Sequence, residues 1–135
     1  VGGGHNHRQN LSDAILIKDN HLAALRARGL SLREVVSLAR QNSPHTITVE
    51  AEVESPEEAA EAAEAGADTI MLDNMSPEEM RRAVALVEGR ALVEASGGVR
   101  LDTVRSIAET GVDLISVGAL THSVRALDFS IEFSP

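Results

Sequence analysis

Short apolar runs rich in β-branched residues alternate along the chain with longer segments that carry apolar residues at helical spacing. Each run has the length of a buried strand, and helix signals lie between the runs. Strands that alternate with helices predict an α/β fold with a parallel sheet and right-handed crossovers. The predicted strands are Ala14–Lys18, Thr46–Val53, Thr69–Asp73, Ala91–Ser96 and Leu114–Gly118.

Three of the segments between the runs begin with a serine that is followed three residues later by a glutamate. They are residues 31–34 (SLRE), 55–58 (SPEE) and 76–79 (SPEE). This spacing predicts a capping box, in which the serine side chain and the glutamate side chain each accept a backbone N–H at the start of a helix. In two of them a proline takes the first helical position, where its missing N–H costs nothing.

An internal repeat relates residues 64–70 (EAGADTI) to residues 109–115 (ETGVDLI), 45 residues later. Each copy ends a helix at a glycine and enters a strand two residues further on. The strand ends Asp73, Ser96 and Gly118 lie 23 and 22 residues apart, so the repeat spans two βα units. This regularity indicates a barrel or an open sheet wound in one direction.

At 135 residues the chain is too short for a complete (β/α)₈ barrel, which needs about 250 residues. We therefore predict an incomplete parallel β/α barrel-type domain of about five to six βα units, with an exposed apolar edge. An open sheet and the C-terminal part of a larger protein are the two possibilities, and we favour the second. No Pro/Gly/Ser-rich linker divides residues 1–135, so we expect a single domain.

Composition narrows the class of function. Apolar residues make up 43% of the chain but only Phe129 and Phe133 are aromatic, which predicts an aliphatic, alanine-rich core. The net charge of −9 disfavours binding to nucleic acid or to anionic membranes. The absence of cysteine excludes disulfides, zinc ribbons and thiol catalysis. Without a long apolar run or a signal-peptide pattern, we expect a soluble, cytoplasmic protein.

Polar residues and glycines occupy the carboxyl ends of the predicted strands, where parallel α/β proteins bind their ligands. Lys18 is the only lysine of the chain and ends an apolar strand, which predicts a ligand-facing role; a salt bridge that anchors a loop is the alternative. The full set of strand ends is Lys18-Asp19-Asn20-His21, Glu52, Asp73-Asn74, Ser96-Gly97-Gly98 and Gly118-Ala119.

Four carboxylates are expected to share one face of the sheet, by the period-two alternation of strands and by the repeat. They are Glu50, Glu52, Asp73 and Glu94. Buried carboxylates need partners, so cations must reach this face. The candidates are Mg²⁺, which commonly arrives with a phosphate, and arginines from a segment outside the chain. The alternative is a purely structural charge network.

Two glycine-containing strand ends suit phosphate binding, because glycine admits close approach of the backbone and a helix N-terminus follows. They are Ser96-Gly97-Gly98 and Gly118-Ala119, at the last two strands. In TIM-type barrels the phosphate site commonly follows the last two strands.

The first residues form a glycine-rich loop with two histidines and an arginine (residues 2–8, GGGHNHR). His5 and His7 could bind a metal, but no third ligand lies near them in the sequence. A grip on carboxylates by His7 and Arg8, near Lys18, explains the loop better. The pattern assigns no role to His5 or His21, and it indicates surface positions for the histidines His45 and His122.

Taken in order, these motifs resemble the quinolinate phosphoribosyltransferases, also called nicotinate-nucleotide pyrophosphorylases (carboxylating). The resemblance runs from residue 2 to residue 133, through GGGHNHRQNLSDAILIKDNH, VEAEVESPEEAAEAAEAGADTIMLDNMSPEEMRRA, EASGGVRLDTVRSIAETGVDLISVGALTHS and ALDFSIEF. It implies a pentosyltransferase that makes nicotinate mononucleotide from quinolinate and phosphoribosyl pyrophosphate, releasing pyrophosphate and CO₂, in de novo NAD biosynthesis. It also implies a homodimer.

The same resemblance implies a role for each matching position. Lys18, Glu52 and Asp73 would be catalytic. The carboxylates of quinolinate would face His7, Arg8 and Lys18. The ribose hydroxyls and the Mg²⁺–pyrophosphate end of the cosubstrate would be held by Glu52 and Asp73. The 5′-phosphate would lie against Ser96, Gly97, Gly98, Val117, Gly118 and Ala119.

Members of the family also carry an N-terminal α/β domain and a first barrel strand that ends in Thr-Arg-Lys-Thr, neither of which is found in residues 1–135. We therefore expect this chain to be the C-terminal barrel portion of such an enzyme. Two alternatives stay open. One is a related phosphoribosyltransferase-like protein of molybdenum-transport gene clusters, with another substrate. The other is a non-catalytic fragment that associates with itself.

Overall fold

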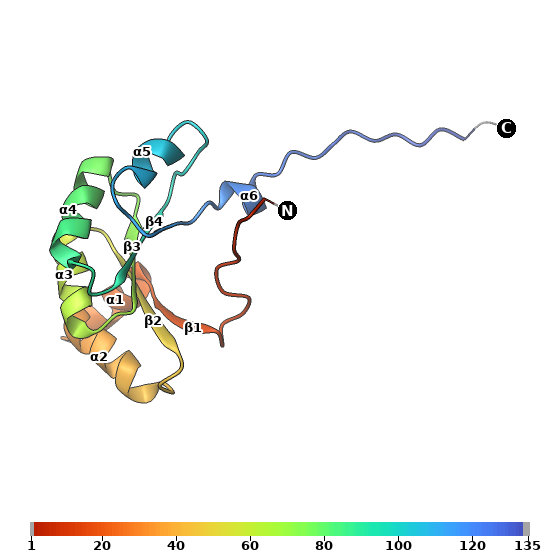
Figure 1. Cartoon of the computed structure of the whole chain (residues 1–135). Coiled ribbons are helices and arrows are strands. Elements are labelled where there is room, and N and C mark those ends of the chain that lie inside the picture. The colour runs from red at the N-terminus through yellow and green to blue at the C-terminus, as the bar shows by residue number, and fades with distance from the viewer. Residues whose placement is uncertain (1, 134–135) are drawn as a thin grey trace.

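The computed structural model describes residues 2–133 and contains one parallel sheet in the order β1-β2-β3-β4-β5 (Figure 1). Every neighbouring pair of strands is parallel, and at least one helix follows each strand. The predicted α/β class and the barrel-type winding are confirmed. The elements are β1 (Ala14–Ile17), α1 (Asp19–Arg26), α2 (Leu32–Asn42), β2 (Thr48–Val53), α3 (Pro56–Ala65), β3 (Thr69–Asp73), α4 (Pro77–Val87), β4 (Leu92–Ser96), α5 (Val104–Ala108), β5 (Leu114–Ile115) and α6 (Ala119–His122).

The last strand is much shorter than predicted. The sequence favours a strand from Leu114 to Gly118, whereas β5 ends at Ile115. The Ser116 N–H still donates to the Ala95 carbonyl at 2.9 Å, but β5 is an edge strand with a neighbour on one side only. The backbone then takes helical angles at Gly118, the residue immediately before α6. Because β5 pairs with a strand on one side only, the turn conformation of the residues that follow Ile115 determines where β5 ends.

The core lies between the sheet and the helices that cover one of its faces (Figure 1). On this face β2 and β3 place aliphatic side chains that are fully buried, among them Val49, Ile70 and Leu72. The alanines Ala59 and Ala83 on α3 and α4 are also fully buried, and their small side chains let the helices approach the sheet closely. The predicted aliphatic, alanine-rich core is confirmed.

The helix starts follow the predicted capping pattern in two of the three segments. Ser31 and Ser76 each accept the N–H of the glutamate three residues on, and that glutamate accepts the serine N–H at 2.8 Å. The capping box predicted at Ser55 is wrong. Ser55 Oγ accepts the Glu58 N–H, but the Glu58 carboxylate accepts the N–H of Glu54 and an arginine N–H of α1 instead. An ion pair with a neighbouring helix has redirected that side chain.

The internal repeat has a structural purpose. Asp68, just before β3, exchanges hydrogen bonds with Val49 of β2: its N–H donates to the Val49 carbonyl and its Oδ2 accepts the Val49 N–H at 2.7 Å. Asp113, just before β5, makes the same two bonds with Val93 of β4. The aspartate that both copies of the repeat contain therefore joins the start of its own strand to the preceding strand of the sheet.

Replacing Asp68 with alanine is expected to destabilise the fold by about 1–3 kcal/mol, because the buried Val49 N–H would lose its side-chain acceptor. Urea unfolding of the chain measures the change. The matched control is Asp102→Ala, since that carboxylate is exposed and pairs only with Arg100 in the described structure. Equal unfolding midpoints for Asp68→Ala and the unchanged chain would contradict this interpretation.

The other face of the sheet is open. Leu92 and Leu114 lie on it with exposed fractions of 50% and 42%, which confirms the expected uncovered apolar surface. Residues 2–13 run along this side, and the segment after α6 extends away from the body of the molecule (Figure 1). Phe129 and Phe133 lie in that extended segment and are exposed rather than part of the core.

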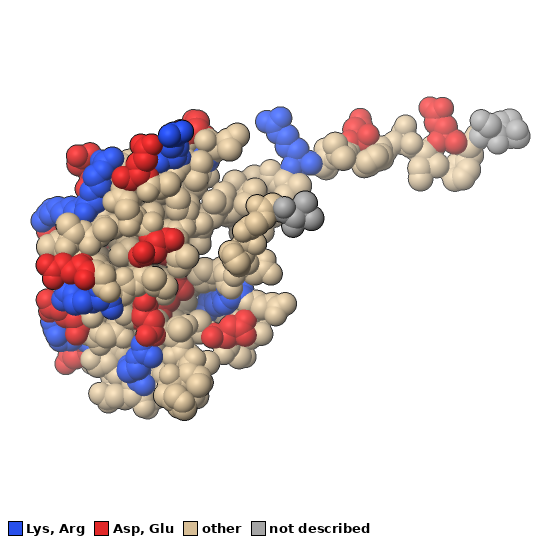
Figure 2. All heavy atoms as spheres, viewed as in Figure 1, with Lys and Arg blue, Asp and Glu red and all other residues tan. Residues whose placement is uncertain are grey.

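Charges of both signs cover the helical layer (Figure 2). Lys and Arg side chains are interspersed with Asp and Glu side chains over the helical layer, where several pairs join neighbouring helices (Figure 2).

Within residues 2–133, none of the helices has the length and apolar character that crossing a bilayer requires.

Candidate functional site

Four of the predicted site residues lie at the same edge of the sheet. Lys18 follows β1 directly, Glu52 is the last residue but one of β2, and Asp73 and Ser96 end β3 and β4. Asp73 and Ser96 are paired across the two strands. Because all strands are parallel, their carboxyl ends meet at one edge, which is where α/β folds place their ligands.

Lys18 and Glu52 form the first contact of this site. Lys18 Nζ lies 3.7 Å from Glu52 Oε2, and the lysine side chain is about half-exposed. The Lys18 N–H donates to Nδ1 of His21 at 3.1 Å, so the ring of His21 closes the first turn of α1 and holds the backbone of the lysine. Lys18, which the sequence predicts to face a ligand, therefore lies at this site with its ammonium group near a carboxylate.

Glu52 is buried, and one of its carboxylate oxygens accepts no hydrogen bond from the part of the chain that the structure describes. Only 8% of the residue is exposed, and its Oε2 has no hydrogen-bond partner within residues 2–133. Burial raises the pKa of Glu52 above its usual value, the negative charge of Asp73 raises it further, and Lys18 opposes both effects. Glu52 Oε2 has Lys18 Nζ at 3.7 Å but accepts no hydrogen bond in the described structure. Two nearby carboxylates, with one oxygen that accepts no hydrogen bond from the described residues, are a donor set of the kind that Mg²⁺ binds, so the residues fit such an ion.

The raised pKa predicts a pH-dependent gain in stability for Glu52→Gln. A carboxyl group whose pKa is higher in the folded state than in the unfolded state destabilises the fold once it is ionised. The variant is therefore expected to be more stable than the unchanged chain at pH 7, and the gap should close as the pH falls to the ordinary value of 4.5.

Urea unfolding at pH 7 and near pH 4.5 measures this gap. Glu132→Gln, in the exposed segment after α6, is the control and should show no difference at either pH. A Glu52→Gln variant that is less stable than the unchanged chain at pH 7 would contradict the assignment.

The loop after β4 is built around two glycines in the left-handed region, Gly97 (φ 87°) and Gly98 (φ 60°). A Cβ atom on Gly97 would overlap the side-chain amide of Asn74, the residue that follows β3. The Asn74 N–H donates to the Ser96 carbonyl at 3.0 Å, which brings the two strand ends together. Glycine is therefore required at position 97 by the backbone and by its neighbour.

The second predicted phosphate segment has no such requirement for glycine. Gly118 has a φ of −61° and opens α6, and a Cβ there would make an ordinary contact with His122. Val117 is half-buried against the core, whereas Gly118 and Ala119 are exposed. Because β5 and β4 are neighbouring strands, this segment lies beside the Ser96–Gly98 loop. Its last two residues are exposed there.

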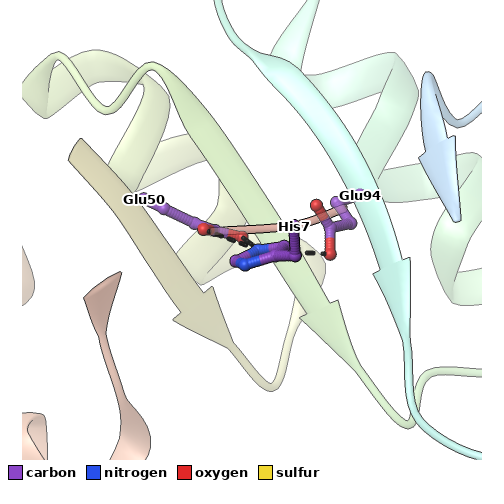
Figure 3. Close-up of side chains that lie close together, drawn as sticks. All are labelled: His7, Glu50 and Glu94. Atoms are coloured by element: carbon purple, nitrogen blue, oxygen red, sulfur yellow. Dashed lines mark hydrogen bonds and ion pairs between the residues drawn. The ribbon is translucent and has the colours of Figure 1, made fainter. Parts of the chain in front are cut away.

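His7 lies between two buried glutamates on the open face of the sheet (Figure 3). Its Nε2 is 3.1 Å from Glu50 Oε2 and 3.9 Å from Glu94 Oε1. Glu50 comes from β2 and Glu94 from β4, and their exposed fractions are 5% and 3%. Burial and then the charge of Glu94 raise the pKa of Glu50, while His7 and, to a smaller extent, the charge of Arg8 lower it. The expectation that these carboxylates share one face is confirmed.

Arg8 and Lys18 contact different groups in the structure. The Arg8 Nη1 donates to the carbonyl of Ala14 at 3.5 Å, at the start of β1. Lys18 lies beyond the other end of that strand, about 13 Å further along the chain direction at 3.3 Å per residue. Within residues 2–133 the three side chains contact different groups: His7 contacts Glu50 and Glu94, Arg8 contacts Ala14, and Lys18 contacts Glu52.

Sequence reasoning missed Ser116, and it placed Asn74 and His21 at strand ends without assigning them a partner. Ser116 Oγ donates to Glu94 Oε1, Asn74 packs on Gly97, and His21 accepts the Lys18 N–H. A signal existed for Ser116, which follows the parity of Glu94 one strand over, and for Asn74, which directly follows a strand end. No sequence signal pointed to the partner of His21. His45 and His122 are exposed, as predicted.

Comparison with known proteins places this geometry in a family. Residues 1–132 match the family model "Quinolinate phosphoribosyl transferase, C-terminal domain". A probable nicotinate-nucleotide pyrophosphorylase (carboxylating) of Bacillus subtilis is 45% identical over 132 residues, which is 98% of this chain and 44% of that protein. The nicotinate-nucleotide pyrophosphorylase (carboxylating) of Homo sapiens is 42% identical over 135 residues, again 98% of this chain and 44% of that protein.

Solved structures agree with the sequence matches. NadC from Streptococcus pyogenes superposes with a TM-score of 0.85 at 47% identity, over 98% of this chain and 45% of that one. A thiamine phosphate pyrophosphorylase from Pyrococcus furiosus superposes with a TM-score of 0.62 at 26% identity, over 78% of this chain and 48% of that one. The chain thus spans about half the length of the relatives that it matches.

Proposed function

Because this chain belongs to the quinolinate phosphoribosyltransferase family and corresponds to its C-terminal domain, we propose that it is the barrel portion of a pentosyltransferase. The reaction would transfer a phosphoribosyl group from phosphoribosyl pyrophosphate to quinolinate with decarboxylation. Nicotinate mononucleotide, pyrophosphate and CO₂ would be the products. The observation that carries this proposal is the set of Lys18, Glu52, Asp73 and the Gly97–Gly98 loop at one edge of the sheet.

Glu52 and Asp73 would hold the ribose hydroxyls and a Mg²⁺ ion. When bound, Mg²⁺ neutralises charge on the departing pyrophosphate. The two carboxylates would also stabilise the positive charge that develops on the ribose as the pyrophosphate leaves. The position of Glu52 Oε2 supports this role, since it lies buried at the strand end with Lys18 Nζ at 3.7 Å and no hydrogen-bond partner in the described structure.

The positively charged groups would act on quinolinate. Lys18, half-exposed at the edge of the sheet, is placed to bind a carboxylate and to stabilise the carbanion that forms on decarboxylation. His7 and Arg8 would complete the carboxylate site from the residue 2–13 segment, where they now contact Glu50 and Ala14. The phosphate would lie against the backbone of Ser96–Gly98 and Val117–Ala119.

Calorimetric titration of the chain tests this function. We expect phosphoribosyl pyrophosphate with Mg²⁺ to bind, because the residues proposed for it lie within residues 2–133. Quinolinate should bind to this chain orders of magnitude more weakly than to relatives that carry the Thr-Arg-Lys-Thr motif, which residues 1–135 do not contain. Each charge-assisted hydrogen bond from that motif would contribute about 1.5–3 kcal/mol. Tight quinolinate binding without phosphoribosyl pyrophosphate binding would overturn this division of the site.

Two further outcomes separate the alternative functions. Binding of phosphoribosyl pyrophosphate together with another acceptor in place of quinolinate would favour the phosphoribosyltransferase-like proteins of molybdenum-transport clusters. Failure of both ligands to bind would favour a non-catalytic fragment. We also propose a cytoplasmic location, where the substrates of a nucleotide-forming enzyme are available.

Self-association is the expected state of the isolated chain. β1 and β5 are sheet edges with unpaired backbone groups, and Leu92 and Leu114 are about half-exposed on the open face. Such surfaces favour association, here as a homodimer or higher homo-oligomer. Sedimentation at micromolar concentration measures the mass of the particle. A stable, compact monomer under those conditions would contradict this expectation.

A further inference from the structure

Three segments far apart in the sequence meet at the His7 cluster, which we define as His7, Glu50 and Glu94. The histidine lies in the N-terminal loop, and the two glutamates lie on β2 and β4 with β3 between them (Figure 3). One possible ligand atom from each residue lies within 4.8 Å of the other two. The sequence suggested a metal at His5 and His7 but showed no third ligand. Among residues 2–133 the fold brings two further ligands to His7 and none to His5.

The charges of this cluster are not balanced. Glu50 and Glu94 are both more than nine-tenths buried, and within residues 2–133 their only ion-pair partner is His7. A protonated histidine would cancel one of the two negative charges, and a neutral histidine would cancel neither. Buried carboxylates without compensation are costly. A divalent cation held by two carboxylates and one neutral imidazole would bring the net charge to zero.

The distances also suit a metal ion. A metal bound at about 2.0–2.2 Å in tetrahedral geometry holds its ligand atoms about 3.4 Å apart. The separations from His7 Nε2 are 3.1 Å to Glu50 Oε2 and 3.9 Å to Glu94 Oε1. Ser116 Oγ donates to Glu94 Oε1 and so orients this carboxylate, as hydrogen bonds to metal-binding side chains commonly do.

We propose that His7, Glu50 and Glu94 form a binding site for a divalent transition-metal ion of the Zn²⁺ class. One nitrogen and two carboxylate oxygens are ligands that Zn²⁺ accepts, whereas Mg²⁺ prefers oxygen ligands alone. The His7 side chain is 38% exposed, which leaves a path for the ion and a coordination position for water. Three protein ligands with one open position are typical of zinc sites that bind a further small ligand.

This site is distinct from the Mg²⁺ site proposed at Glu52 and Asp73, and it does not depend on the proposed function. The two sites share no residue. His7 belongs to both the metal cluster and the proposed quinolinate site, so a bound metal would compete with quinolinate for this histidine. Binding of the metal alone, without substrate, therefore tests the site independently of catalysis.

Calorimetric titration of the complete 135-residue chain with ZnCl₂, in a non-chelating buffer at pH 7, tests the proposal. We expect one Zn²⁺ per chain. The variants His7→Gln, Glu50→Gln and Glu94→Gln should each weaken binding at least tenfold. Loss even of a residue that only hydrogen-bonds to a metal ligand costs about 10–100-fold in metal affinity. Mg²⁺ at the same concentration should not displace Zn²⁺.

The matched control is His5→Ala, which removes a histidine two residues away that lies outside the cluster. It should leave the affinity unchanged. If His5→Ala weakens binding and Glu94→Gln does not, the ion is held by the loop alone and the proposal is wrong. Displacement of Zn²⁺ by an equal concentration of Mg²⁺ would overturn the assigned metal class.

A measurement on the unchanged chain covers the case in which a variant fails to fold. Zn²⁺ should shift the NMR signals of the His7 ring and of the Glu50 and Glu94 backbone amides together, at one equivalent. Substitution by Co²⁺ should add the intense visible absorption of a four- or five-coordinate ion. Shifts confined to residues 2–8 would overturn the proposal.

Discussion

Replacing Asp73 with asparagine is expected to lower the rate of phosphoribosyl transfer at least tenfold. The substitution keeps the shape of the side chain but removes its charge, and Asp73 is half-buried at the end of β3 beside the Gly97–Gly98 loop. Loss of one electrostatic partner of a transition state commonly costs about 10²–10³ in kcat. The rate of nicotinate mononucleotide formation is measured in the enzyme that contains this domain, with saturating Mg²⁺.

The fold should survive the Asp73→Asn change, because its hydrogen bond in the structure comes from the adjacent Asn74 side chain and ties no other element down. Equal melting temperatures would establish this. Glu109→Gln is the matched control: it neutralises an exposed carboxylate after α5 that pairs with Arg105. Turnover of Asp73→Asn within twofold of the Glu109→Gln control would end the assignment of Asp73.

Replacing Gly97 with alanine is expected to weaken binding of phosphoribosyl pyrophosphate at least tenfold. At a φ of 87° a side chain costs about 1–2 kcal/mol, and here the added Cβ also overlaps the Asn74 amide. The loop after β4 must therefore move away from the position in which its backbone faces the strand ends. A cost of 1.4 kcal/mol in this rearrangement already corresponds to tenfold in affinity, which calorimetry resolves.

Gly29→Ala separates the effect on the loop from the effect of backbone strain. Gly29 has nearly the same φ, 85°, but a Cβ there meets nothing within 4 Å, and the residue lies between α1 and α2. We expect Gly29→Ala to lower the free energy of unfolding while leaving the affinity for phosphoribosyl pyrophosphate unchanged. Equal affinities for the two variants would show that the Gly97 loop does not contact the phosphate.

Several features of the fold could be predicted because they depend on neighbours in the sequence. The period-two pattern of β2 places Glu50 and Glu52 on one face, and the alternation of apolar runs with capped helices predicts the parallel sheet. The Ser31 and Ser76 caps need only a serine, a glutamate and the helix between them. These properties follow from the local geometry of strands and helices, so a single sequence contains them.

Other features depend on which segments meet in space. Glu58 leaves its predicted cap because an arginine of α1 lies beside it, and β5 ends early because it has a strand on one side only. Asp68 looked like part of a helix-to-strand turn, yet its carboxylate serves the backbone of Val49, nineteen residues earlier. Contacts of this kind form only when the helices pack on the sheet.

The candidate site shows the same division. Polar residues at the strand ends, carboxylates on one face and glycines after β4 can all be found from the sequence, since strand periodicity and turn chemistry are local. The contacts of His7 with Glu50 and Glu94, and of Arg8 with the start of β1, emerge only in the folded chain. Those partners are set by the path of a loop across the open sheet, and that path is determined by packing and charge between segments that are distant along the chain.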